Sequence, residues 1–240
     1  MPIRSLLWLR RSLLAGLVLG TSYVIASQAH RSRWYQDHLV QLLHTGDSIQ
    51  RERAATTLAY IAAEAPLIDA LRYDRLEVRE AAKRALDARW FQSEGIETAK
   101  RLIEAEVAIS QEHCDDALVT LDAVVREHPS FAEGWNRRAG LLWKMGRVGA
   151  CLQSCEHALE SNGQHYGAWL GLALCHMKLG HSQEARASLQ AYLSLQPFDT
   201  IASDSLKKCD ALAELEETEY RLSVAAQLPP PFTPEQSSAR

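Results

Sequence analysis

The pattern of small, large and helix-breaking residues repeats every 34 positions between Thr98 and Asp199, without a gap or an insertion. Trp135 has its equivalent 34 positions later in Trp169. We call such a set of equivalent positions a column; other columns hold small residues, apolar residues, or the Pro or Gly that ends each unit. Two antiparallel helices approach closely only where one of them presents a small side chain, so the pattern predicts packed helices. The columns are Ala105, Ala139 and Ala173; Ala117, Cys151 and Ala185; Leu121, Cys155 and Leu189; Val124, Ala158 and Tyr192; and Pro129, Gly163 and Pro197.

These features resemble the tetratricopeptide repeat, a helix-turn-helix unit of this period. The resemblance covers about 100 of the 240 residues and divides residues 98–199 into three units, 98–131, 132–165 and 166–199. It implies an all-α fold, an α-solenoid with a concave surface. The run from Phe131 to Ala139 further resembles a group of such proteins from bacteria and from plant and algal organelles.

In the family that this segment resembles, partners usually lie in a groove lined by the first helix of each unit. Some members grip the C-terminal carboxylates of chaperones with a clamp of Lys, Arg and Asn. Leu102 and Glu106 stand where that clamp needs Lys and Asn, so we expect an amphipathic helix or an extended apolar peptide instead. The alternative is that one of the chain's own segments covers the groove, either the helix expected after the repeats or the proline-rich tail that follows it. The expected groove residues are Leu102, Glu106, Asn136, Trp143, Lys144, Leu170, Leu174, Met177 and Lys178.

Residues 34–92 show a shorter self-similarity. The run from Arg51 to Leu58 is echoed 28 positions later by the run from Arg79 to Leu86. Both carry Arg-Glu followed by small residues and leucine, which resembles a HEAT-type repeat pair. Residues 34–92 are therefore expected to form HEAT-like helical repeats.

After the repeats, residues 200–223 have the apolar spacing of an amphipathic helix. Terminal repeats of a solenoid need a cover, so we expect this helix to cap the array. Residues 224–240 include a proline-rich run and are expected to be a disordered tail.

The amino terminus combines a basic segment, residues 1–11, with an uncharged segment, residues 12–29. As a helix, the uncharged segment reaches roughly 27 Å, about the thickness of the bilayer's hydrocarbon. We expect a single-pass membrane anchor; a cleaved signal ending near Ala29 and an organelle presequence are the alternatives. A short anchor ahead of such repeats resembles the layout of import receptors of the mitochondrial outer membrane. A mitochondrial or other organelle membrane is therefore expected, with the bacterial envelope as the alternative.

A net charge of -4 gives no general attraction to nucleic acid. We find no phosphate-binding glycine loop and no nucleophile elbow, and expect neither an enzyme nor a small-molecule substrate, cofactor or metal. Cys151 and Cys155 lie one helical turn apart, but occupy columns filled by Ala and Leu in the sister units, which favours core packing. With five cysteines and no CxxC motif, the repeats fit a reducing compartment.

The sequence thus predicts a membrane-anchored scaffold or adaptor that binds a peptide of a protein partner in the repeat groove. The alternative is a soluble assembly factor of the periplasm or an organelle lumen, released by cleavage near Ala29.

Overall fold

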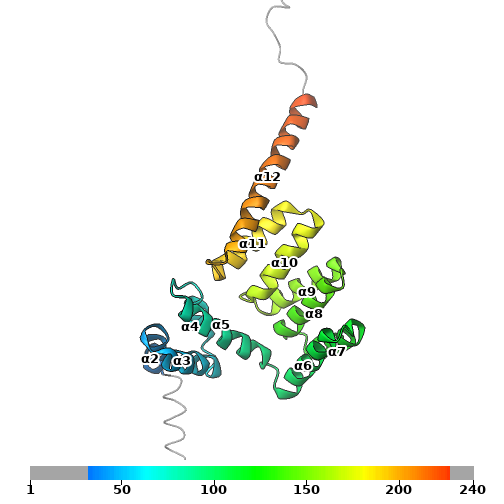
Figure 1. Cartoon of the computed structure of the whole chain (residues 1–240). Coiled ribbons are helices and arrows are strands. Elements are labelled where there is room, and N and C mark those ends of the chain that lie inside the picture. Colours follow the sequence, from blue (N-terminus) through cyan, green and yellow to red (C-terminus); the bar gives the residue numbers. More distant parts are fainter. Residues whose placement is uncertain (1–31, 228–240) are drawn as a thin grey trace, which may run out of the picture. The chain divides into compact units, whose positions relative to one another are not determined.

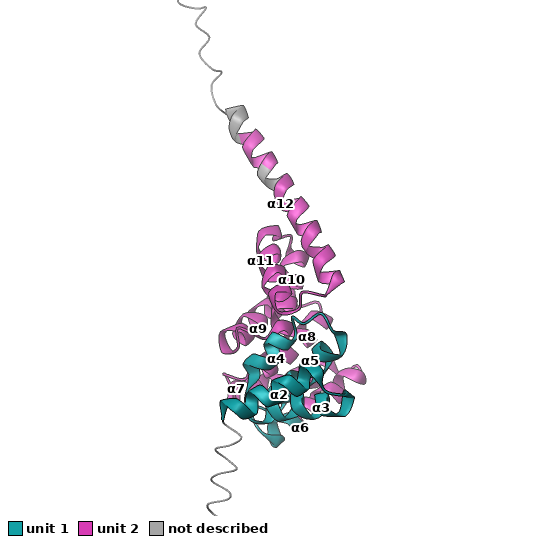
Figure 2. Cartoon of the chain, turned by 90° about the vertical axis from the view of Figure 1, so that its left-hand side faces the viewer, with its two compact units in different colours: residues 1–100 teal, residues 101–240 magenta. Residues whose placement is uncertain are grey.

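The computed structural model describes residues 32–227, and the fold within this range is all-α (Figure 1). The chain divides into two compact units, residues 1–100 and 101–240 (Figure 2). The predicted basic segment, the predicted anchor at residues 12–29 and the proline-rich run after residue 227 lie outside the described residues. Within residues 32–227, no helix combines the length and the apolar character needed to cross a bilayer.

From residue 32 onward, unit 1 contains four helices and the start of a fifth. The Asp47 side chain accepts a hydrogen bond from the Gln50 N–H, and the Gln50 side chain accepts one from the Asp47 N–H, which starts α3 with a capping box. α3 packs against α5, and Arg84 of α5 forms an ion pair with Glu52 of α3 at 2.9 Å. The four helices are α2 (Arg33–Thr45), α3 (Ser48–Tyr60), α4 (Glu64–Ala70) and α5 (Leu76–Phe91).

The two echoed runs of the sequence lie on α3 and α5, and their alanines face the core of unit 1. Ala54 and Ala82 are almost completely buried, as are Leu58 and Leu86. Small residues therefore occupy the contact between the two helices, as close helix packing requires. The assignment of residues 34–92 to HEAT-like repeats stays a prediction.

The repeats form consecutive helix pairs, which confirms the predicted all-α, helix-turn-helix fold class. The small columns are buried: Ala105, Ala139 and Ala173 expose 3% or less of their surface. The boundary between the two units falls inside α6, after Lys100. The pairs are α6 (Ile96–Ser110) with α7 (Cys114–Glu127), α8 (Ala132–Lys144) with α9 (Val148–Ser161), and α10 (Tyr166–Leu179) with α11 (Ser182–Leu195).

The repeated tryptophans form hydrogen bonds with the breaker column, the Pro or Gly that ends each repeat. The indole N–H of Trp135 donates to the carbonyl of Pro129 at 2.9 Å. One period later the indole N–H of Trp169 donates to the carbonyl of Gly163 at 2.8 Å. Each tryptophan thus holds the loop that enters its own unit.

A left-handed residue turns the chain between the two helices of every unit. Gly146 and Gly180 have φ of 72° and 76°, and Glu112 takes the equivalent place with φ of 64°. Glycine adopts this conformation without the clash that a Cβ causes. Of the three 34-residue repeats, only the first, residues 98–131, therefore carries a strained residue in this turn.

Gly146→Ala should lower the free energy of unfolding by about 1 kcal/mol, because alanine is strained at positive φ. A Cβ at Gly146 would meet nothing within 4 Å, so the effect is one of backbone strain. Gly149→Ala is the matched control, since this helical glycine also has open space around it. It should raise stability by about 0.5–1 kcal/mol. Urea unfolding measures both changes in stability. If both variants were stabilised, or both destabilised, the assignment of backbone strain to position 146 would be contradicted.

α12 (Thr200–Gln227) packs on α11 and then extends beyond it (Figure 1). The Asp199 side chain accepts the N–H of Ala202 at 3.0 Å at its start, and Arg186 of α11 pairs with Asp210 at 2.7 Å. The helix continues past the predicted end at residue 223, so residues 224–227 are helical and not part of a disordered tail. The reason is that the sequence has no breaker before Pro229.

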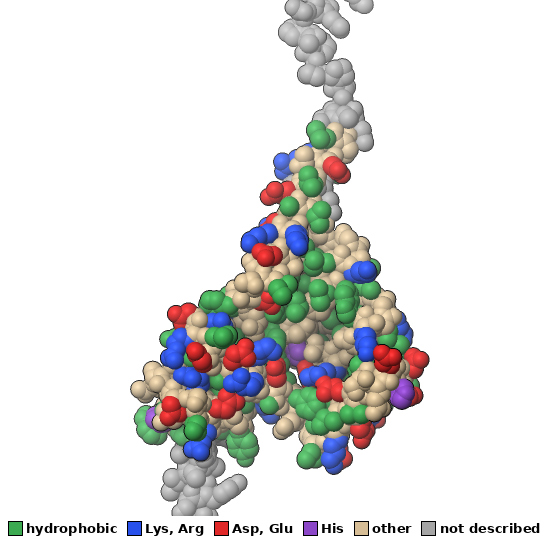
Figure 3. Space-filling view, viewed as in Figure 1, with side chains coloured by type: hydrophobic (Ala, Val, Ile, Leu, Met, Phe, Trp, Pro, Cys, Tyr) green, Lys and Arg blue, Asp and Glu red, His purple; other side chains and the backbone are tan. Residues whose placement is uncertain are grey.

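The face of α12 that is buried is not the face that carries its large apolar side chains. Ala202, Cys209 and Ala213 are buried, whereas large apolar side chains lie on other faces. Hydrophobic side chains are accordingly visible along the projecting helix (Figure 3). Small residues of α12 occupy the contact with α11 because they allow the two helices to approach closely. The exposed side chains include Ile201, Leu212, Leu215 and Leu222.

Candidate functional site

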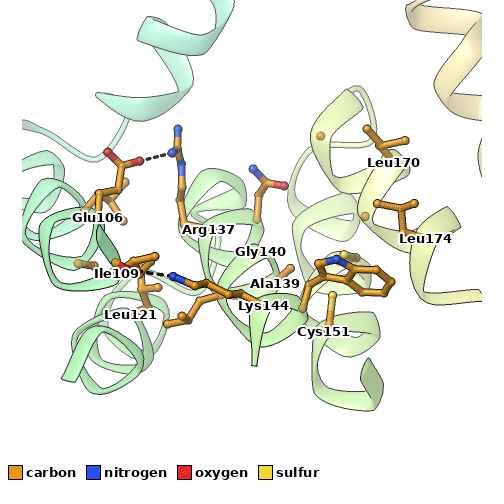
Figure 4. A pocket seen from close by; sticks show the side chains of 18 residues that line it. Glu106, Ile109, Leu121, Arg137, Ala139, Gly140, Lys144, Cys151, Leu170 and Leu174 are labelled. Atoms are coloured by element: carbon orange, nitrogen blue, oxygen red, sulfur yellow. Dashed lines mark hydrogen bonds and ion pairs between the residues drawn. The ribbon is translucent and has the colours of Figure 1, made fainter. Parts of the chain in front are cut away.

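An open groove of about 480 Å³ lies on unit 2, with α6, α8 and α10 supplying most of its walls (Figure 4). These are the first helices of the three repeat units. Met177 and Lys178, near the end of α10, lie outside the lining. The structure brings together seven of the nine predicted residues, namely Leu102, Glu106, Asn136, Trp143, Lys144, Leu170 and Leu174. Their role in binding stays a prediction.

The apolar part of the groove spans α8 and α10. Trp143 and Leu174 are each 37% exposed, so both have area to offer a ligand. Leu102 is only 1% exposed and contributes to the packing beneath the surface rather than to a contact face. Gly140 adds width, because a Cβ there would meet nothing within 4 Å. Leu102 thus belongs to the groove lining but offers a ligand almost no accessible surface.

Two cationic side chains cross the groove toward α6 (Figure 4). Arg137 of α8 forms an ion pair with Glu106 of α6. The ammonium group of Lys144 donates to the carbonyl of Ile109, near the end of α6, at 3.1 Å. A cation near a helix C-terminus is favoured by the partial negative charge of the last carbonyls. Both cationic side chains of the described groove lining are thus already paired with groups of α6.

A buried network holds Arg137 from below. Glu133 is 6% exposed, and it accepts hydrogen bonds from Arg137, Asn136 and His165. The His165 contact joins Nε2 to Glu133 Oε2 at 2.9 Å, while His165 Nδ1 accepts the N–H of Ala168 at 3.2 Å. His165 therefore caps α10 through Nδ1 and contacts α8 through Nε2.

The pKa of Glu133 lies below its ordinary value. Burial works in the opposite direction, because it disfavours the charged carboxylate. The hydrogen bonds from His165 and Arg137, together with the positive charge of Arg137, outweigh burial. Glu133 is therefore an ionised, buried acceptor that fixes two groove-side residues, Asn136 and Arg137.

The sequence did not identify Glu133 as part of the site, although it lies in the quoted run from Phe131 to Ala139. The available signal was a charged residue at the start of α8 facing a histidine nearly one repeat later. His165 is a buried histidine, and both of its ring nitrogens form hydrogen bonds.

Two models of tetratricopeptide repeat families match the chain, one over residues 104–150 and one over residues 142–208. Unit 2 therefore contains tetratricopeptide repeats. A repeat-containing protein of Rhizobium etli is 31% identical over 102 residues, which are 42% of this chain and 50% of the relative. The chain thus spans about half the length of that curated relative.

The fold also resembles solved repeat structures. The first tetratricopeptide domain of Spaghetti (RPAP3), bound to the HSP90 peptide SRMEEVD, has 19% identity and a TM-score of 0.46, covering 48% of this chain and 93% of that one. MamA has 14% identity and a TM-score of 0.45, covering 78% of this chain and 85% of that one. These likenesses concern the fold alone.

Proposed function

We propose that the groove of unit 2 binds a peptide segment of a partner protein, through apolar contacts with Trp143 and Leu174. The observation that carries the proposal is an open groove in which a tryptophan and a leucine keep more than a third of their surface exposed. Partly exposed aromatic residues in a concave site are the usual anchors of protein interfaces. Polar side chains around them set the position of the ligand.

The capping helix does not occupy the groove within the described chain. The α12 residues that are buried pack against α11, and the described lining of the groove contains no α12 residue. Of the two self-covering segments that the sequence suggested, this leaves the proline-rich tail, which lies outside the described residues. The partner peptide and the tail are therefore competitors in the test below.

The bound segment is internal to the partner rather than its C-terminal end. A terminal carboxylate needs a cation to receive it, but Arg137 already contacts the carboxylates of Glu106 and Glu133. Lys144 donates to a backbone carbonyl of α6. A ligand carboxylate would have to displace these partners, whereas an apolar side chain only has to cover Trp143 and Leu174.

Selection of peptides from a random displayed library on the immobilised full chain tests the proposal. Selected peptides should be rich in apolar residues at helical or alternate spacing. Replacing their C-terminal carboxylate by an amide should change Kd by less than about threefold, since both cations of the described groove lining, Arg137 and Lys144, already have partners within the chain. A tenfold loss on amidation would contradict the internal-segment proposal. Competition by a synthetic peptide of residues 228–240 would identify the tail as the occupant.

For the amino terminus we propose a membrane tether formed by residues 12–29, which places the repeats beside a membrane. An organelle membrane is the favoured location, and the bacterial envelope is the alternative. Carbonate extraction followed by intact-mass measurement of the native protein tests this. Full-length protein in the membrane pellet is the expected result. A soluble product that starts near His30 would support the rival assembly factor of the periplasm or an organelle lumen.

A further inference from the structure

Three cysteine side chains converge beneath the groove. Cys151 and Cys155 lie one turn apart on α9, and Cys175 lies on the adjacent α10. The Sγ atom of Cys175 donates to the Sγ atom of Cys151 at 3.0 Å. All three side chains are at most 1% exposed. The sequence pointed to the first two as packing residues, and the fold adds the third.

A glycine on α10 makes room for this cluster. A Cβ at Gly171 would lie 2.8 Å from the Sγ of Cys155, which is closer than real Cβ contacts allow. α9 and α10 therefore approach closely at the level of the sulfur atoms. The Cys151 and Cys175 sulfur atoms need to approach by only about 1 Å to reach the length of a disulfide bond.

The cluster also favours a thiolate. Hydrogen bonds from Cys155 and Cys175 lower the pKa of the Cys151 thiol to about 4, while burial acts in the opposite direction. The pKa of Cys155 is raised, chiefly because its hydrogen bond to Cys151 stabilises the protonated thiol. Cys151, whose sulfur accepts a hydrogen bond from the Cys175 thiol, is therefore the candidate nucleophile of the cluster.

The groove provides the route by which a small oxidant reaches the cluster. Cys151 and Cys155 line the groove, whereas Cys175 does not. Their burial excludes bulky reagents but leaves one side toward the groove. Across residues 32–227, no group of His, Cys, Asp or Glu is arranged to hold a metal ion. The 3.0 Å separation of the Cys151 and Cys175 sulfur atoms favours oxidation to a disulfide.

We propose that Cys151 and Cys175 are a redox modification site at which hydrogen peroxide generates a reversible disulfide between α9 and α10. The Cys151 thiolate attacks one peroxide oxygen, the O–O bond breaks, and the released hydroxide takes a proton to leave as water. The Cys175 sulfur then attacks the sulfenic sulfur of Cys151, the S–O bond breaks, and a second water leaves. Two thiols and one peroxide give one disulfide and two waters.

This inference does not depend on peptide binding in the groove. It depends on all five cysteines being free thiols at the start, as the structure has them. The disulfide would join the helix that carries Leu174 to the helix beneath it. A change in peptide affinity on oxidation would be a separate finding, and its absence would leave the modification site intact.

Intact mass of the reduced full chain, before and after limited hydrogen peroxide, tests the proposal. After alkylation in denaturant, the number of alkylated thiols should fall from five to three. The unalkylated protein should be about 2 Da lighter, and dithiothreitol should restore it. Digestion after glutamate is required for mapping, because Glu156 and Glu160 separate Cys151 from Cys175, whereas no Lys or Arg lies between these cysteines. The expected product joins the peptides that contain Cys151 and Cys175.

Single variants identify the partners. Cys151→Ala is expected to fold, because the sister units carry alanine in this column, and it should abolish the loss of two thiols. Cys175→Ala should do the same, and Cys209→Ala is the control, a buried cysteine outside the cluster that should leave the product unchanged. Persistence of the 2 Da loss in Cys151→Ala would overturn the proposal. So would a crosslinked peptide pair without Cys175 in the unmodified chain, a result that requires no variant to fold.

Discussion

Glu133→Gln should lower the free energy of unfolding by about 2 kcal/mol. The two carboxylate oxygens of Glu133 accept hydrogen bonds from Arg137 on one side and from His165 and Asn136 on the other. Glutamine has one oxygen, so its NH2 group must face one of these donors in a buried position. A hydrogen bond to a charged group contributes about 1.5–3 kcal/mol, and an unsatisfied buried group costs a similar amount. Urea unfolding of the full chain measures the loss.

The chain offers a matched control for this change. His157 and Glu160 form an ion pair at 3.1 Å, but both side chains are more than half exposed. Glu160→Gln should therefore change stability by less than about 0.5 kcal/mol. Equal losses in the two variants would show that the buried network contributes no more than a surface pair.

The free energy of unfolding that Glu133 contributes should depend on pH. The pKa of Glu133 is lowered in the folded chain, so its stabilisation is complete above its unfolded pKa of about 4.3. The stabilisation is lost as the pH falls through the lower, folded pKa. The stability difference between the unmodified chain and Glu133→Gln should thus be constant from about pH 7 to pH 5 and shrink below about pH 4. A difference that grows on acidification would contradict the assignment of an ionised Glu133.

Trp143→Ala combined with Leu174→Ala should weaken the binding of selected peptides by about 30- to 100-fold. Both side chains are partly exposed in the groove, so their loss removes ligand contact while leaving the buried small columns unchanged. Truncation of a central aromatic anchor alone commonly costs 2 kcal/mol or more. Fluorescence anisotropy with a labelled peptide measures Kd, and circular dichroism checks that helical content is retained.

Tyr220→Ala combined with Leu222→Ala is the control for this pair. It also removes an aromatic residue and a leucine, both largely exposed, from α12 outside the groove. Peptide affinity should stay within about twofold. If the control weakens binding as much as the groove variant, the projecting face of α12, not the groove, is the binding surface.

The repeat architecture was predictable because its signals are local and recur. Each unit repeats the small columns at its helix contacts, and both tryptophans hydrogen-bond the carbonyl at the breaker position. The groove residues followed from the same register, since a fixed period places equivalent positions on equivalent helix faces. Met177 and Lys178 lie outside the lining because the groove does not reach the end of α10.

Features that depend on contacts between units were less predictable. Glu133, at the start of the second repeat, meets His165, the residue that caps the first helix of the third, and neither residue belongs to the columns described above. Cys175 joins Cys151 because antiparallel helices bring residues 24 positions apart into contact. The packing stripe of α12 was also hidden, because helical spacing alone ranks Leu212 and Leu215 above Ala202 and Ala213. Close packing on α11 selects the small residues.

Photo-crosslinking shows where a bound peptide lies on the chain, and it can therefore locate peptide binding in the groove of unit 2. A selected peptide carrying benzoylphenylalanine at its central apolar position would be irradiated on the full chain, and the adducts mapped by mass spectrometry. Adducts are expected on α8 and α10, centred on Trp143, Leu170 and Leu174, and they should be lost on competition with unlabelled peptide. Competed adducts that fall only on unit 1 or on α12 would contradict binding in the groove.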